Sequence, residues 1–90
     1  MKASDYFTIW NESEDKEQSL LKICNGFIRE TAELVKTRKI KTPSGLNGVL
    51  TEQRQKWISL ARKTGGYLKE GGYVTLIAQE LPDIAQYFKL

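Results

Sequence analysis

The apolar residues of this chain follow a helical period most clearly between Leu20 and Val35. At about 100° per residue, Leu20, Phe27 and Leu34 fall on one line along a helix. Other residues flank this line and widen it into an apolar stripe: Leu21, Cys24, Ile28, Thr31 and Val35. A stripe of this width needs neighbours on both flanks, so the pattern predicts the central helix of a small helical core.

The central helix has recognisable start and stop signals. Ser13 is a typical N-cap residue, and the acidic residues that follow suit the positive amino end of a helix: Glu14, Asp15 and Glu17. The helix is predicted to run to about Ile40, where basic side chains suit the negative carboxyl end. Asn25-Gly26 is a turn signal, but the apolar register continues across it. A continuous helix with a local penalty of about 1 kcal/mol is therefore predicted.

A short aromatic segment precedes the central helix. Ser4 can cap a helix from Asp5 to about Trp10, in which aromatic residues are unusually frequent. So short a helix is not stable alone, and we expect it to dock on the core of its own chain rather than on another subunit. A candidate interface to another protein within this segment comprises Tyr6, Phe7 and Trp10.

Turn-forming residues follow the central helix at 42–45 and 47–48 and predict a loop there. Thr51 is then a suitable N-cap for a third helix, in which apolar residues recur on one line: Leu50, Trp57, Ala61 and Leu68. Arg54 interrupts that line. We favour its placement in the first turn, with its head group reaching solvent, over a buried position beside Glu30 or Glu33.

Two glycine pairs, Gly65-Gly66 and Gly71-Gly72, leave two interpretations open for the residues around them. In the favoured one the third helix continues to Glu70 and ends at the second pair. In the other, residues 67–69 and 73–77 form a β-hairpin. Neither pair stands in a known phosphate-binding motif, so helix termination is the expected role of these glycines.

The last segment has apolar residues at alternating spacings of three and four: Val74, Ile77, Leu81, Ile84 and Phe88. Pro82 removes a backbone donor inside this register, so the segment is predicted to be one kinked helix or two short ones. The whole pattern predicts an all-α fold in one domain, residues 1–90. It is a small helical bundle of three main helices plus a short N-terminal aromatic helix, with the C-terminal helix kinked or split at Pro82.

The composition argues against an enzyme. The chain has no histidine and one cysteine, and no pair of carboxylates or nucleophile with a base has a recognisable spacing. Cys24 lies in the apolar stripe and is expected to be a small buried residue. We therefore expect no catalytic residue, metal site, cofactor or small-molecule ligand. The longest uncharged apolar segment, 73–79, is too short to cross a bilayer, and with no signal peptide a cytoplasmic location is expected.

The charge is distributed unevenly, with a net charge of −3 over residues 1–35, +7 over 36–70 and −1 over 71–90. If the helices pack with the basic residues on one face, the protein could contact nucleic-acid phosphates through that face. The candidate residues are Lys36, Arg38, Lys39, Lys41, Lys56, Arg62, Lys63 and Lys69. The favoured alternative is a protein-interaction or regulatory module, because so short a chain carries a surplus of apolar helix surface. The expected partner is another protein or a second copy of this chain.

Overall fold

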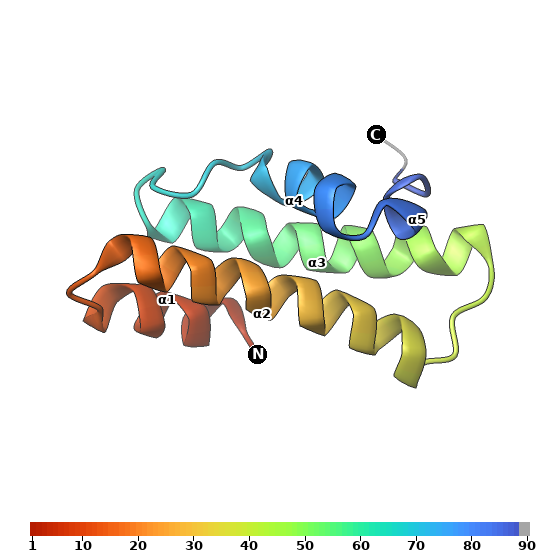
Figure 1. Ribbon diagram of the computed structural model, residues 1–90, viewed down its shortest axis with the longest axis horizontal. Helices are drawn as coiled ribbons and strands as arrows, with labels where there is room; N and C mark the ends of the chain where they lie inside the picture. The colour runs from red at the N-terminus through yellow and green to blue at the C-terminus, as the bar shows by residue number, and fades with distance from the viewer. Residues whose placement is uncertain (89–90) are drawn as a thin grey trace.

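The computed structural model describes residues 1–88, which form five helices and no strand (Figure 1). The helices are α1 (Ala3–Glu12), α2 (Lys16–Thr37), α3 (Pro43–Lys63), α4 (Gly72–Glu80) and α5 (Pro82–Ala85). The all-α fold is confirmed, and so is the break of the last helix at Pro82. The hairpin does not form, because residues 72–80 are helical.

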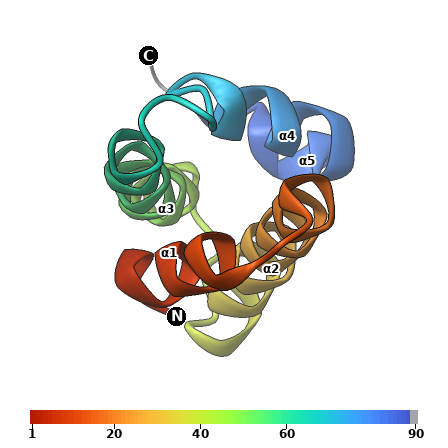
Figure 2. The ribbon, with the colours of Figure 1, turned by 90° about the vertical axis from the view of Figure 1, so that its left-hand side faces the viewer.

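The two long helices, α2 and α3, run antiparallel along the longest dimension of the molecule, 41 Å (Figure 1). Helix α1 packs against both of them, and α4 packs against both on the opposite side (Figure 2). Helix α5 continues from α4. Viewed along the long axis, α1, α2, α4 and α3 therefore surround one core (Figure 2).

Aromatic rings from four helices meet at the centre of that core. The ring of Phe27, which is 0% exposed, stacks on Tyr6 with centroids 4.7 Å apart. It contacts Trp57 edge-on at 5.1 Å and Tyr73 at 5.9 Å. The buried line of α2 is Ser19, Ile23, Phe27 and Thr31. This line is rotated relative to the predicted one, and Phe27 is common to both.

Helix α2 is continuous through Gly26, as predicted. A Cβ atom at this position would lie 2.8 Å from the hydroxyl oxygen of Tyr6, so the glycine lets α1 approach α2 closely. The start of α2 differs from the prediction. Its N-cap is Asp15, whose carboxylate accepts a hydrogen bond from the backbone of Gln18 at 3.1 Å. The hydroxyl of Ser13 instead donates to the Asp15 carbonyl.

Helix α3 begins earlier than predicted, at Pro43 instead of near Thr51. Thr42 is its N-cap and accepts a hydrogen bond from the backbone of Gly45 at 3.0 Å. Proline at the first helical position lacks only a donor that would have no helical partner. The residues interpreted as a loop are therefore a helix start. Gly45 has a further role, because a Cβ there would lie 2.8 Å from Ile40.

Helix α3 ends at the first glycine pair, which corrects the predicted end at the second. Gly65 and Gly66 have φ angles of 66° and 86°. The backbone of Gly66 donates to Ala61, and that of Gly65 donates to Arg62, at 3.1 Å in both bonds. This pattern is a Schellman motif, in which left-handed residues satisfy the last carbonyls of a helix. The second pair starts α4, with Gly71 as its N-cap.

The end of α2 has the same hydrogen-bond pattern, with Lys39 in the left-handed position at φ 53°. That conformation costs an L residue about 1–2 kcal/mol, and a glycine would avoid this cost. A glycine would also increase the conformational entropy of the unfolded chain, which offsets part of the gain in stability. We expect Lys39→Gly to raise the free energy of unfolding by about 0.5–1 kcal/mol in urea titrations. The control, Lys41→Gly, has an exposed residue without positive φ and should lower it. Equal effects of the two changes would contradict the prediction.

Arg54 lies in the middle of α3 and not in its first turn, because the helix starts at Pro43. The side chain is partly buried, and its Nε has no hydrogen-bond partner among the described residues. Glu30 pairs with Lys56 instead. The favoured place in the first turn is therefore wrong, and the alternative pairing of Arg54 with Glu30 or Glu33 does not form either.

Candidate functional site

A largely apolar hollow lies between α2, the α3–α4 loop and the start of α4. We call it the α2–α4 groove. Its volume is about 600 Å³, within the range of about 300–1,000 Å³ typical of ligand sites. It is open to solvent and is lined by Leu20, Cys24, Trp57, Tyr67, Leu68, Lys69, Gly71, Gly72, Thr75, Leu76 and Gln79.

The floor of the groove is fixed by Trp57. Its indole N–H donates to the backbone carbonyl of Lys69 at 2.7 Å, which holds the α3–α4 loop against α3. A Cβ atom at Gly72 would lie 3.0 Å from the indole ring, so the glycine allows α4 to start directly on that ring. Leu68 belongs to this loop and has a buried side chain, and its backbone N–H donates to the Thr64 hydroxyl at 3.4 Å. The groove is thus a preformed surface of the core.

The wall formed by α2 is apolar. Leu20 and Cys24 are partly buried against the core, so Cys24 is less buried than the sequence predicted. Burial raises the pKa of the Cys24 thiol, which therefore stays protonated near neutral pH and acts as an apolar group. Leu21 lies next to this wall and is 58% exposed. An apolar surface consequently continues from the groove onto the outer side of α2.

The three aromatic residues predicted as an interface occupy two environments. Tyr6 is buried in the core and donates to Glu30 at 2.9 Å, so its side chain is not available to a partner. Phe7 and Trp10 are partly buried, with ring centroids 5.9 Å apart. Trp10 also contacts Tyr67, whose exposed ring lies at the rim of the groove. The aromatic segment therefore docks on its own chain, as favoured from the sequence.

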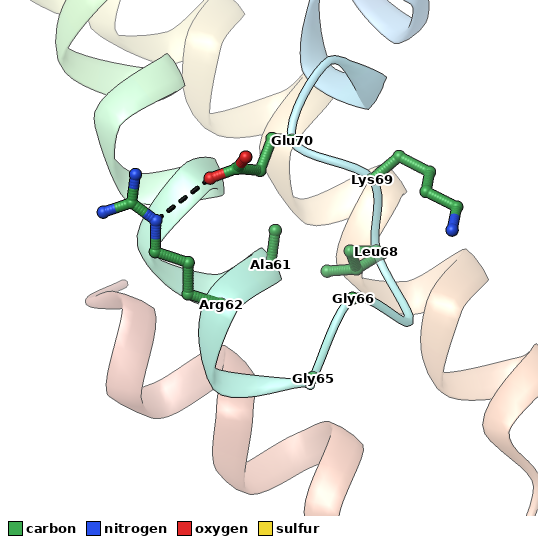
Figure 3. A pocket seen from close by; sticks show the side chains of 7 residues that line it. All are labelled: Ala61, Arg62, Gly65, Gly66, Leu68, Lys69 and Glu70. Carbon is green, nitrogen blue, oxygen red and sulfur yellow. Dashed lines mark hydrogen bonds and ion pairs between the residues drawn. The ribbon is translucent and has the colours of Figure 1, made fainter.

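A second hollow, of about 520 Å³, lies beside the end of α3 (Figure 3). Arg62 donates to Glu70 across it at 3.0 Å, so the two charges pair with each other. Lys69 extends away from this pair (Figure 3). The backbone amides of Gly65 and Gly66 donate to α3 and are not directed at a ligand. This hollow therefore lacks the free amides of a phosphate-binding loop.

The eight basic residues proposed for nucleic-acid binding lie in three places. Four surround the α2–α3 turn, namely Lys36, Arg38, Lys39 and Lys41, and three lie at the far end of α3 or just after it, namely Arg62, Lys63 and Lys69. The two sets are about 30 Å apart, because α3 separates them with a rise of about 1.5 Å per residue (Figure 1). The eighth, Lys56, lies between them. The structure does not bring these residues together on one face.

Three of the eight also have acidic partners. Arg38 makes two hydrogen bonds to Glu52, at 2.8 and 3.2 Å, and Arg62 pairs with Glu70. Lys56 pairs with Glu30 and is only 17% exposed. Nucleic-acid binding stays a prediction. The basic residues form two small clusters, one at each end of α3, instead of one continuous basic surface.

Glu30 is the polar centre that the sequence interpretation missed. It accepts hydrogen bonds from Lys56, from the Tyr6 hydroxyl and from the α-amino group of Met1. Burial by itself would raise the pKa of Glu30, but the bonds from Lys56 and Tyr6 outweigh it and lower that pKa. Burial, and next the bond to Glu30, raise the pKa of Tyr6. All these donors are engaged within the chain, so the cluster stabilises the contact between α1, α2 and α3.

Other classes of site find little support. Residues 1–88 contain no group of three or more Cys, Asp or Glu side chains that could hold a metal ion. None of the described helices combines the length and the hydropathy needed to cross a membrane. Comparisons of the chain with protein-family models, with curated proteins and with solved structures found no match. The α2–α4 groove is therefore the candidate functional site.

Proposed function

We propose that this protein is a non-enzymatic protein-interaction domain that binds the apolar face of a helix from its partner in the α2–α4 groove. The observation that carries the proposal is the groove itself, an open and apolar hollow walled by two helices. An amphipathic helix laid between two helices is a common mode of peptide recognition.

The shape and chemistry of the groove favour a helix over a small molecule. Its walls are mainly aliphatic and aromatic, whereas its polar side chains come from the rim: Lys69, Thr75 and Gln79. A small polar ligand is usually fixed by several converging polar groups within an enclosed site. Exposed Leu21 extends the apolar surface beyond the hollow, which suits a longer occupant.

Selection from a displayed library of amphipathic helical peptides, randomised on the apolar face, tests this proposal. Peptides that bind the purified protein should lose at least about tenfold in affinity for Leu76→Glu, because the change puts a charge on the groove wall. Ala78→Glu is the matched control, since it adds the same charge to an exposed position of α4 outside the groove. Fluorescence anisotropy measures each affinity. Selected peptides that bind Leu76→Glu as tightly as the wild type would contradict the proposal.

A further inference from the structure

The outer side of α2 carries an apolar strip with an unusual symmetry. The strip consists of Leu21, Cys24, Ile28, Ala32 and Val35. Their spacings of three, four, four and three place them symmetrically about Ile28, at four and seven residues on either side. These spacings are those of a helix–helix seam. The spacing of the apolar positions is therefore the same in both directions along the helix.

The chain itself covers this strip only in part. Leu21 is exposed, and the other four residues are partly buried. Only Cys24 belongs to the side chains that pack on the core cluster among the described residues. Cys24 also lines the α2–α4 groove, so the strip and the groove form one continuous surface.

The charges at the two ends of the strip are opposite. Glu14 and Glu17 lie at its amino end, and Lys36 and Lys39 lie at its carboxyl end, all of them exposed. Within the helix itself, Glu17 lies in the first turn of α2 and Lys36 lies in its last turn. An antiparallel copy of α2, centred on Ile28, would therefore place acidic ends against basic ends. A parallel copy would place like charges together.

From this symmetry and charge pattern we infer that the partner helix is α2 of a second copy of this chain, packed antiparallel along the strip across a two-fold axis at Ile28, with its carboxyl end beside the α2 wall of the groove. The inference rests on the proposed function and names its partner. Each contact occurs twice in such an isologous interface, with Leu21 against Val35 and Cys24 against Ala32 of the second copy. Val35 of each copy thereby approaches the groove of the other.

Charge exchange between the ends tests both the partner and the orientation. One variant carries Glu17→Lys, and the other carries Lys36→Glu with Lys39→Glu. Each should weaken self-association at least about tenfold in sedimentation velocity, because like charges then meet at both ends of the interface. An equimolar mixture of the two should associate to within about threefold of the wild type, since the heterodimer restores opposite charges at both ends.

Cross-linking measures the register independently. Under mild oxidation Ala32→Cys should form an intermolecular disulfide with Cys24 of the second copy, whereas Glu33→Cys, which faces away from the strip, should not. The antiparallel interface would be overturned if the charge variants associated as strongly as the wild type. It would also be overturned if Ala32→Cys and Glu33→Cys cross-linked equally. A wild-type protein that stays monomeric up to millimolar concentration would overturn the inference, while the peptide selection decides the proposed function separately.

Discussion

Replacing Phe27 by alanine is expected to lower the free energy of unfolding by about 3–5 kcal/mol, measured by urea titration at a protein concentration where the chain is monomeric. The Phe27 ring is fully buried and contacts Tyr6, Trp57 and Tyr73, which belong to α1, α3 and α4. Its removal opens a cavity at a point where all three of these helices contact α2. Because small domains are only marginally stable, we expect the alanine variant to be largely unfolded.

A second substitution keeps this prediction measurable if the alanine variant does not fold. Phe27→Leu removes less volume and should lower the free energy of unfolding by about 1–3 kcal/mol. Leu21→Ala, on the exposed side of the same helix, is the control and should cost less than about 1 kcal/mol. Losses of equal size at the buried and the exposed position would show that Phe27 does not anchor the core.

The apolar period of α2 predicted a helix, but it did not fix which line of that helix is buried. Ser19 and Thr31 lie on the buried line. Their hydroxyls have partners that a period analysis cannot show, since Ser19 donates to the Lys16 carbonyl and Thr31 lies 2.7 Å from the Tyr73 hydroxyl. Tyr73 is far away in sequence, and burial raises its pKa to about 12. The buried line therefore includes Ser19, which lies outside the predicted stripe, and leaves Leu20 and Leu34 only partly buried.

The errors at the helix ends have a common origin, because the same residues serve as turn signals and as helix caps. Thr42 and Pro43 can end one helix or start the next, and here they do the latter. Gly65-Gly66 and Gly71-Gly72 are alike in composition, yet the first pair ends α3 and the second starts α4. Which role applies depends on tertiary packing, such as the fit of Gly72 against Trp57.

The candidate site was harder to predict than the fold. Residues of the α2–α4 groove come from α2, α3, the α3–α4 loop and α4, and only the packed chain brings them together. The surplus of apolar helix surface was the one signal available in advance, and Leu21 is its clearest instance. The basic residues illustrate the opposite case, since neighbours in charge along the sequence lie at opposite ends of α3 (Figure 1).

Replacing Glu30 by glutamine should lower the free energy of unfolding by about 2 kcal/mol at pH 7 and should also change its dependence on pH. Glutamine keeps an acceptor for Tyr6 but leaves the ammonium of Lys56 without its opposite charge in a site where both side chains are mostly buried.

The same reasoning makes charge reversal at Lys56 a poor test of nucleic-acid binding, because it would disturb the fold. Lys63, which is exposed, is the better position.

The pH dependence distinguishes the charge of Glu30 from a general loss of packing. Because the pKa of Glu30 is lower in the folded chain than in the unfolded chain, its carboxylate stabilises the fold above the ordinary glutamate pKa of about 4.3. That stabilisation is lost as the pH falls through the folded-state value. Urea titrations from pH 7 to pH 3 should therefore show a smaller loss of stability on acidification for Glu30→Gln than for the wild type.

Glu33→Gln provides the matched control for this pH dependence, because Glu33 is exposed one turn further along α2. It should keep the acid-dependent loss of the wild type and change stability at pH 7 by less than about 0.5 kcal/mol. If Glu30→Gln followed the wild-type profile with a constant offset, the carboxylate would act only as a hydrogen-bond acceptor and not through its charge. A flattened profile for Glu30→Gln alone would mean that one charge, held by Lys56 and Tyr6, joins α1 and α3 to the central helix.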